Sequence, residues 1–240
     1  MIMEEHGRME HVEQGDAGIG VVYSPMIWSD VEAITRQFDE TWGHYALLGD
    51  NQKLSLLLSY HFVLHYIEPA TRGEIAHKNG QFMGVVLSRV SGQPVMFGNV
   101  AQEMAKIDER LNSIPAGRKA LMDTELGFEI ERRMERQTGI NDKAPAEVEL
   151  FLVSSASRGQ GVGGQLWSRT MEYFERAHEP MFYLHTDSDC DVSFYDRHGM
   201  KRIAEREEQR HPDDGRDRGM APTKMFIYAG VPAKVKQTVS

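Results

Sequence analysis

Arg158-Gly159-Gln160-Gly161-Val162-Gly163-Gly164 joins an apolar run at 147–153 to a segment whose apolar residues recur every three or four positions. The heptapeptide is therefore predicted to be a glycine-rich turn between a strand and a helix. Such a turn presents unpaired backbone N–H groups and the positive end of the helix dipole, which together bind anions. Gly161 and Gly163 permit close approach and unusual dihedral angles, while Arg158 adds a cation. These residues favour a pyrophosphate ligand, and a plain tight turn is the alternative interpretation.

The sequence on both sides of this loop predicts a βαβ unit. Residues 147–153 should form the first strand, and the helix after the loop should end near His178. Pro180 then introduces a second apolar strand, 181–185. Because such crossovers are right-handed and join parallel strands, the two strands are expected to be parallel in one sheet. The apolar stripe of the helix consists of Val162, Leu166, Thr170, Met171 and Phe174.

The C-terminal segments are expected to extend this sheet. A short helix is predicted at 191–198, ending at Gly199, and two further strands at 201–209 and 224–229. The sequence between those strands contains His211-Pro212-Asp213-Asp214-Gly215, which is typical of an exposed loop.

The N-terminal part is expected to begin with a loose polar arm over residues 1–20 and a short strand at 20–23. Ser29 or Asp30 can cap a helix that ends near Gly43. Its apolar residues recur with the spacing of one buried face, namely Val31, Ile34, Phe38 and Trp42.

A second, largely buried helix is predicted from about Asp50 through Tyr66, since apolar residues cover much of its circumference. Within it, His61 and His65 lie one turn apart, as a metal-binding pair would. No glutamate follows His61 and no third ligand is evident, so helix packing is the favoured interpretation. Beyond this helix, Lys78-Asn79-Gly80 is a turn signal between two runs that can form strands, which predicts a β-hairpin over 72–90.

Charged helical sequence occupies about 99–138 and is interrupted by Ser113-Ile114-Pro115-Ala116-Gly117. Two helices are therefore expected to be inserted between strands. This insert can be interpreted as a lid over a binding site or as a solvated structural excursion, and the sequence does not distinguish the two.

Composition narrows the classes of protein. With 240 residues and 40% hydrophobic content, the chain can bury a normal core. A formal net charge of −9 argues against a nucleic-acid partner and favours a cationic or amine-bearing substrate. The apolar runs are far shorter than the roughly 20 residues of a membrane helix, so no membrane partner and a cytoplasmic location are expected. The single cysteine, Cys190, excludes an internal disulfide and suits a reducing compartment.

Two nucleotide-binding motifs do not fit the glycine loop. A Walker loop needs Gly-Lys-Ser/Thr, whereas Gly163-Gly164-Gln165 supplies neither the lysine nor the hydroxyl. A dinucleotide fold needs Gly-x-Gly-x-x-Gly on the first strand of its domain, and the spacing here differs. Nucleotide hydrolysis and dinucleotide binding are therefore disfavoured.

The loop resembles the defining motif of the GNAT superfamily of acyl-CoA-dependent N-acyltransferases, Arg/Gln-x-x-Gly-x-Gly/Ala. Arg158, Gly161 and Gly163 match it, in the strand-to-helix context in which that family places it. The family also often carries a tyrosine four residues before a glycine and an apolar residue, matched here by Tyr195, Gly199-Met200. The clear resemblance covers about 147–228.

The resemblance implies one acyltransferase domain over 1–240, of the α/β (α+β) class, with a mixed central β-sheet flanked by helices. The insert at about 99–138 would lie between the third and fourth strands and departs from the minimal fold. About 145–230 would form the coenzyme-binding and C-terminal half.

The resemblance further implies where acetyl-CoA would lie. Backbone amides of the loop would hold the coenzyme A pyrophosphate, the amide of Phe151 would polarise the thioester, and Val153 would pair with the pantetheine arm. Ser188 occupies the place where the family often has an asparagine that contacts the coenzyme. The loop residues concerned are Arg158, Gly159, Gln160, Gly161, Val162, Gly163 and Gly164.

Transfer of an acetyl group to an amine needs a base for the ammonium and an acid for the departing thiolate. By resemblance, Tyr195 is the general acid, with an ordinary core tyrosine as the alternative. Glu147 and Glu149, two residues apart on one face of the strand before the loop, are candidates for the base, with two exposed carboxylates as the alternative. His185 and Asp187 compete with them.

Two other features favour structural interpretations. Thr186-Asp187-Ser188-Asp189-Cys190-Asp191 is rich in carboxylates, but the spacing does not continue into a calcium loop, so a helix-capping acidic turn is favoured and no metal is expected. Cys190 can line the site or act as a small packing residue.

The sequence thus predicts an N-acetyltransferase that moves an acetyl group from acetyl-CoA to a primary amine by direct attack. A non-catalytic acyl-CoA-binding module is the alternative. Small amines and the amines of proteins or peptides stay open as acceptors, and a homodimer stays open as the assembly.

Overall fold

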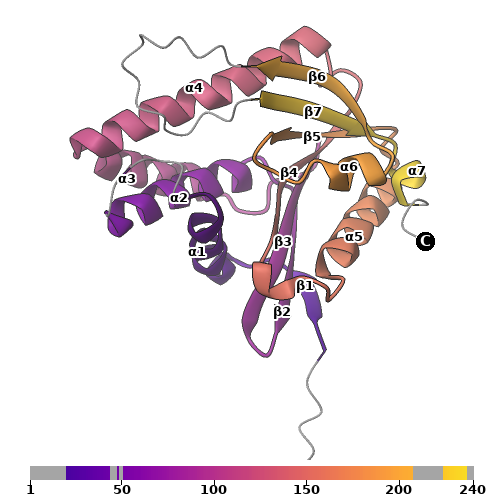
Figure 1. Ribbon diagram of the computed structural model, residues 1–240, viewed down its shortest axis with the longest axis horizontal. Helices are drawn as coiled ribbons and strands as arrows, with labels where there is room; N and C mark the ends of the chain where they lie inside the picture. The colour runs from indigo at the N-terminus through magenta and orange to yellow at the C-terminus, as the bar shows by residue number, and fades with distance from the viewer. Residues whose placement is uncertain (1–19, 44–47, 49–50, 208–223, 237–240) are drawn as a thin grey trace, which may run out of the picture.

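The computed structural model describes residues 20–43, 48, 51–207 and 224–236. These residues form a seven-stranded sheet in the order β1-β2-β3-β4-β5-β7-β6, flanked by helices (Figure 1). The strands are β1 (Val22–Pro25), β2 (Arg72–Lys78), β3 (Gln81–Val90), β4 (Ala146–Val153), β5 (Phe182–Asp187), β6 (Lys201–Glu207) and β7 (Lys224–Gly230). The helices are α1 (Val31–Trp42), α2 (Gln52–Ile67), α3 (Val100–Asn112), α4 (Pro115–Thr138), α5 (Val162–Arg176), α6 (Ser193–Arg197) and α7 (Pro232–Lys236).

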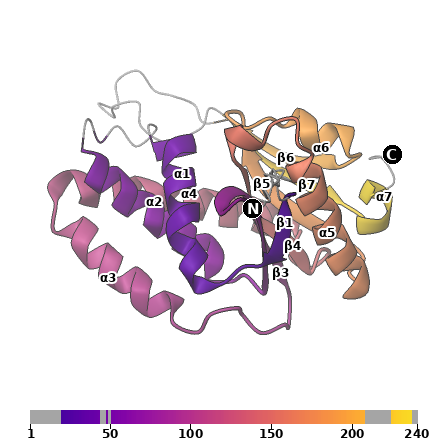
Figure 2. The ribbon, with the colours of Figure 1, turned by 90° about the horizontal axis from the view of Figure 1, so that it is seen from below.

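The helices cover the two faces of the sheet as separate layers. α1 to α4 lie on one side and α5 to α7 on the other, with the strands between them (Figure 2). Each side has its own apolar core, one built around α1 and α2 and the other around Leu166, Trp167 and Phe174 of α5. The predicted mixed sheet flanked by helices is therefore confirmed, and each amphipathic helix buries one stripe against it.

The N-terminal predictions hold with small changes. β1 begins at Val22, slightly later than expected, and a single 3-10 turn (Trp28–Asp30) precedes α1. Asp30 stands at the start of α1 but does not cap it, because its carboxylate accepts the N–H of Ile27 at 2.8 Å. The hairpin turn is confirmed, and Asn79 and Gly80 both adopt positive φ, 51° and 75°, as a tight two-residue turn between twisted strands requires.

The inserted helices belong to the packed body of the protein. α3 and α4 lie between β3 and β4 in the chain, as predicted, and Pro115 opens α4 at the expected break. α3 packs on α2 and buries Val100, Ile107 and Leu111, while α4 buries Phe128 and Met134. The interpretation of the insert as a solvated excursion is therefore wrong, because both helices contribute apolar side chains to the core.

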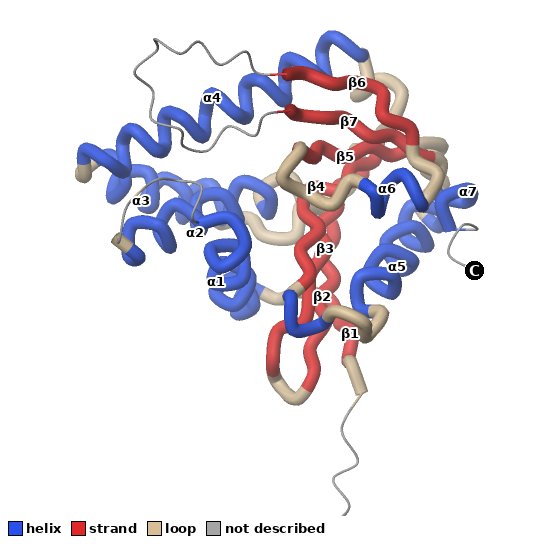
Figure 3. Tube along the Cα trace, viewed as in Figure 1, coloured by secondary structure: helices blue, strands red, loops and turns tan. Residues whose placement is uncertain are grey.

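β4 and β5 separate from each other partway along the sheet (Figure 3). They are parallel neighbours, as the βαβ unit predicts, but they pair only at Ala146–Phe182 and Glu147–Tyr183. β4 continues along β3 to Val153, with a bulge at Glu149, since Leu150 pairs with Leu87 and Val148 with Ser88. A bulge redirects a side chain and interrupts pairing. Because the pairing with β5 ends at Glu147, the opposite edge of β4 has no strand partner beyond that residue among the described residues.

Several predictions fall outside the part of the chain that the structure describes. They are the N-terminal arm, the loop at 211–215 and the ends of two predicted elements, Asp50 and 208–209. Among the described residues, each helix is too short or too polar to cross a lipid bilayer.

Candidate active site

The glycine loop presents an open backbone surface at the start of α5. Gly159 and Gly161 have φ values of 75° and 71°, and a Cβ added at Gly159, Gly161 or Gly164 would meet no atom within 4 Å. Gly161 is the N-cap, and no side chain caps the helix there. The N–H groups of the first turn are therefore available to an anion, as the sequence predicts. The unusual dihedral expected at Gly163 is wrong, because Gly163 lies within α5, and Gly159 carries it instead.

Two cations stand close to this loop. Arg158 is exposed, and Lys78 reaches the loop from the β2–β3 hairpin, where its Nζ donates to Oε1 of Gln160 at 2.9 Å. Gln160 in turn donates to the carbonyl of Ala156 at 3.0 Å. The sequence marks Arg158 but not Lys78, which comes from a distant segment. The loop thus combines free N–H groups with positive charge, which suits a pyrophosphate.

A cavity of about 680 Å³ lies where β4 and β5 separate. Its lining joins residues of the two layers, because Phe128 and Glu131 come from α4 while Tyr195 comes from α6 on the other side. Phe151 also lines it, and the position that a Cβ would take at Gly163 is 3.6 Å from the Phe151 ring. Phe151 therefore connects the lining of the cavity with the start of the helix that follows the glycine loop.

Arg89 binds both carboxylates that the sequence nominates as the base. It lies opposite Glu147 in the β3–β4 register and forms an ion pair with it through Nη2, while its Nε donates to Oε1 of Glu149 at 2.7 Å. Glu147 is buried, and Glu149 sits at the bulge. Burial, and in the case of Glu149 the neighbouring charge of Glu147, raises the pKa of both, that of Glu149 to about 8. The two carboxylates share one guanidinium.

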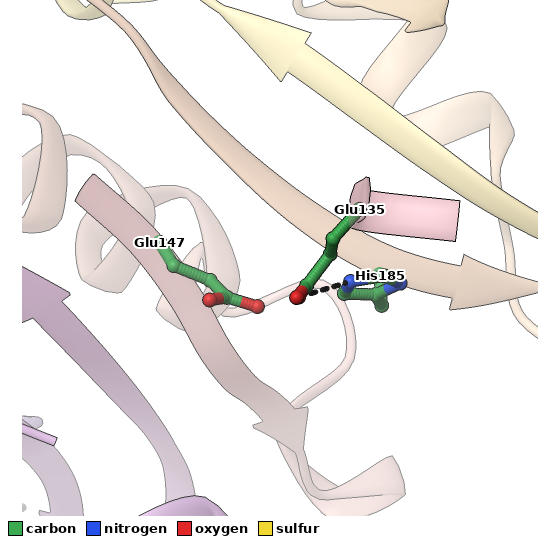
Figure 4. A group of neighbouring side chains, drawn as sticks. All are labelled: Glu135, Glu147 and His185. Carbon is green, nitrogen blue, oxygen red and sulfur yellow. Dashed lines mark hydrogen bonds and ion pairs between the residues drawn. The ribbon is translucent and has the colours of Figure 1, made fainter. Parts of the chain in front are cut away.

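A second pair adjoins this group. His185 of β5 approaches Oε1 of Glu135 of α4 through Nε2 at 3.0 Å, and the two lie beside Glu147 (Figure 4). Burial lowers the pKa of His185, but the hydrogen bond to Glu135 and the carboxylates of Glu131 and Glu147 outweigh it and raise the pKa to about 9. His185 is therefore protonated at neutral pH and acts as a cation of the cluster rather than as a base.

Glu135, Glu147 and His185 offer ligand atoms within 4.8 Å of one another. Each already has a partner of opposite charge, because Glu147 binds Arg89 and His185 binds Glu135. A protonated imidazole cannot ligate a metal ion. The three side chains therefore form, with Arg89, a hydrogen-bonded network of charged groups.

Glu131 differs from the other carboxylates of the cluster. It lies on α4, one turn before Glu135, and lines the cavity, and none of the described residues bonds to its carboxylate. Burial raises the pKa of Glu131 to about 7, with His185 opposing the rise and Glu147 adding to it. Glu131 therefore titrates near neutrality and is free to accept a proton.

Tyr195 lines the cavity from α6, and its ring packs against Trp167 and Tyr228 at centroid distances of 6.0 and 5.5 Å. Burial, with the charges of neighbouring groups, raises the pKa of Tyr195 well above its ordinary value, so the phenol keeps its proton. Cys190 lines the same part of the cavity, and burial raises the pKa of its thiol to about 12. The thiol is therefore not a thiolate at neutral pH.

The remaining predicted residues, Ser188 and those of the acidic turn, lie at or after the end of β5. Ser188 is exposed and ties the end of β5 to β7, where its Oγ accepts the N–H of Lys224 at 3.3 Å. Asp187 and Asp191 accept the backbone N–H groups of Asp189 and Ser193, at 2.8 and 3.2 Å, as the carboxylates of an acidic turn can. The helix-capping role predicted for this turn is wrong, because Val192 is the N-cap of α6 and no side chain caps that helix. Asp187 also lines the cavity, and burial raises its pKa.

The two histidines of α2 pack as predicted. His61 is buried and its Nδ1 lies 2.7 Å from Asp108 of α3. His65 stacks on Phe128 at 3.5 Å between ring centroids and lines the cavity, which the helix-packing interpretation did not foresee.

Sequence reasoning missed Arg89, Glu131 and Glu135. The last two are spaced one helical turn apart in a helix rich in charges, so nothing local separates them from solvent-facing glutamates. Nothing local identifies Arg89 either, because the predicted hairpin does not show which of its residues lies opposite Glu147 in the sheet.

No protein-family model and no curated protein sequence matches the chain. Solved structures do match. Arylalkylamine N-acetyltransferase 2 from Aedes aegypti aligns with a TM-score of 0.57 and 15% identity, covering 88% of this chain and 99% of that one. Agmatine N-acetyltransferase, in the apo form of a variant, aligns with a TM-score of 0.51 and 13% identity, covering 89% of this chain and 100% of that one. Mosquito arylalkylamine N-acetyltransferase like 5b aligns with a TM-score of 0.50 and 14% identity, covering 88% of this chain and 100% of that one.

These alignments span nearly the whole of each neighbour, and at such low identity they report the fold. The chain therefore has the fold of these N-acetyltransferases, which confirms the GNAT-like fold predicted from its sequence.

Proposed function

We propose that this chain is an N-acetyltransferase that moves an acetyl group from acetyl-CoA to a primary amine by direct attack. The observation that carries the proposal is one cavity lined by both Tyr195 and the carboxylate cluster, together with Phe151, whose ring lies beside Gly163 of the loop. An acyl-CoA-binding module without catalysis needs the loop alone. It gives no reason for a free carboxylate of near-neutral pKa to face the same cavity.

The donor side comprises the loop 158–164 and the unpaired edge of β4. Free N–H groups of α5, Arg158 and Lys78 suit the pyrophosphate. Past Glu147, β4 lacks a partner on the β5 side among the described residues, and a strand directs alternate backbone groups to each side. This edge supports the proposed roles of Phe151 and Val153, the first at the thioester carbonyl and the second at the pantetheine amide.

The acceptor side comprises the carboxylate cluster and the walls formed by α1, α2 and α4. We assign the base to Glu131, because a base must be ionised, accessible and not held by a cation. Glu147 and Glu149, the candidates from the sequence, share Arg89 and are assigned to holding the cluster in place. The negative charge of the cluster attracts the ammonium form of an amine.

These groups account for every proton and every bond that changes in the transfer. One ammonium proton goes to Glu131, the nitrogen attacks the thioester carbon, and the C–S bond breaks as the C–N bond forms. The sulfur takes a proton from Tyr195, and the second proton leaving the nitrogen restores the phenol. Because burial opposes a tyrosinate, we expect this return to be closely coupled to the donation.

Direct attack is favoured over an acetyl-cysteine intermediate. Cys190 is the single cysteine of the chain and lines the cavity, but only the thiolate is an effective nucleophile. With a pKa of about 12, its thiol is ionised to a negligible extent at neutral pH. A Cys190→Ala variant is therefore expected to keep its activity.

The test is thiol release from acetyl-CoA in the presence of a library of amines, together with a thermal shift on adding coenzyme A. The neighbours are named for arylalkylamine and agmatine, so both kinds of amine belong in the library. We expect amine-dependent thiol release. A thermal shift with no thiol release from any amine would support the binding module instead.

A further inference from the structure

The cavity has an apolar end formed by aromatic rings of α1, α2 and α4. Phe38 contacts Trp42 and Phe62 at centroid distances of 4.8 and 5.4 Å, and Phe62 contacts Phe128 at 5.5 Å in an edge-to-face arrangement. All four rings line the cavity. Aromatic walls of this kind bind apolar groups through burial and ring contacts.

The rings that form this end carry no charge at neutral pH. His65 lies flat on Phe128, and burial lowers the pKa of His65 to about 4, so its imidazole is neutral. Lys119, Asp123 and Arg132 also line the cavity, but they are partly exposed and already paired, since Lys119 binds Asp123 at 2.9 Å and Arg132 binds Glu129 at 3.1 Å. A charged group of a ligand placed among the rings would lose its hydration without gaining a free partner there.

The opposite end is acidic. The carboxylates of the lining are Glu131, Glu135, Glu147, Glu149 and Asp187, against the cations Arg89 and His185, and Arg206 also lines the cavity. Tyr66 marks the boundary between the two ends, because its ring belongs to the aromatic wall while Glu131, Asp187 and Glu149 all raise the pKa of its phenol, after burial itself. The aromatic and the acidic parts of the lining thus adjoin at Tyr66.

We infer that the acceptor is an amphipathic monoamine, with one ammonium at the acidic end and an aromatic or alkyl body against the rings of α1, α2 and α4. This inference rests on the proposed function. Polyhydroxylated polyamines and diamines fit the lining poorly, because their further polar or charged groups would lie among the rings. A peptide amine would likewise bury backbone groups that the rings cannot satisfy.

The wild-type chain provides the first test. Initial rates of thiol release are measured with unbranched primary amines from propylamine to hexylamine, with 2-phenylethylamine, and with ethanolamine and 1,4-diaminobutane for comparison. A buried methylene gains about 0.8 kcal/mol, so kcat/KM should rise about fourfold for each carbon added. We expect 2-phenylethylamine to exceed ethanolamine at least about 100-fold. A flat series, or 1,4-diaminobutane equal to hexylamine, would overturn the inference.

A variant and a binding measurement separate failure of this inference from failure of the proposed function. Phe128→Leu should lower kcat/KM for 2-phenylethylamine about tenfold more than that for ethanolamine, with Met122→Leu, exposed on the same helix, as the control. Calorimetric titration of the wild type with 2-phenylethylamine and ethanolamine needs no turnover. Selective binding of 2-phenylethylamine without thiol release would support the amphipathic monoamine as ligand and contradict the proposed catalysis. Rapid acetylation of ethanolamine or 1,4-diaminobutane would support catalysis and contradict the inference about the acceptor.

Discussion

The donor side and the acceptor side of the cavity are built in opposite ways. The donor side is contiguous in sequence, running from the end of β4 through Gly161 into α5, and it offers backbone N–H groups. The acceptor side gathers side chains from α1, α2, α4, β3, β4 and β5. Backbone groups need only glycines in the right places, whereas a charge cluster needs particular side chains brought together by the fold. The first arrangement suits one constant ligand, and the second can change with the acceptor.

The sharpest test of this contrast compares two carboxylates of the acceptor side. Glu131→Gln should lower kcat/KM for the amine about 10²–10³-fold, because general base catalysis contributes effects of that size. Glu149→Gln should cost at most about tenfold, since its carboxylate is already bound by Arg89. Both are measured by thiol release at saturating acetyl-CoA. The reverse order of effects would return the base to the strand position that the sequence nominated.

The difference between the two sides also explains what could be predicted from the sequence. The βαβ unit, the hairpin and the insert follow from periodicity and turn residues, which act locally. Tyr195 and the loop could be nominated because their spacing carries the resemblance. Glu131 and Arg89 could not, because their importance depends on the bulge at Glu149 and on the separation of β4 from β5, which arise from contacts between distant segments.

Replacement of Tyr195 by Phe tests the point at which the two sides meet. We expect kcat to fall about 10–100-fold, because the departing sulfur loses its proton donor. The KM for acetyl-CoA should stay within about twofold, since the N–H groups that bind the pyrophosphate do not involve this side chain. Steady-state kinetics with acetyl-CoA varied separates the two quantities. An unchanged kcat would remove the assigned role and leave Tyr195 as a packing residue beside Trp167.

The pH dependence provides an independent check on Glu131. Its pKa is raised to about 7, and the base works in the ionised form, so activity should fall about tenfold per pH unit below 7 and level off above it. The amine substrate also titrates, so the useful quantity is the ratio of wild-type to Glu131→Gln rates, in which that titration cancels. Titration of His185 and Tyr195 should not change the pH dependence of this ratio below pH 8, because His185 has a pKa of about 9 and the pKa of Tyr195 is raised. A ratio constant from pH 5.5 to 8.5 would contradict the assignment.

On the donor side, Gly161→Ala should raise the KM for acetyl-CoA about tenfold with little change in kcat. An L-residue at a φ of 71° costs roughly 1–2 kcal/mol, and the loop can relieve that strain only by moving its N–H groups. Gly164→Ala is the matched control, because Gly164 lies within α5 and a Cβ there also meets open space. Equal effects of the two substitutions would mean that steric access, rather than backbone conformation, governs coenzyme binding.

The smallest expected effect concerns Lys78, the cation that joins the donor side from the hairpin. Lys78→Ala should raise the KM for acetyl-CoA about two- to fivefold, as the loss of an exposed charge contact of up to ~1 kcal/mol implies. Because exposed charges are screened by salt, the difference should shrink as ionic strength rises from about 0.05 M to 0.5 M. Lys53→Ala, at an exposed position on α2, is the control and should leave the KM unchanged. If Lys78→Ala has no effect at low salt, the donor side depends on the contiguous loop alone, and the contrast with the assembled acceptor side becomes complete.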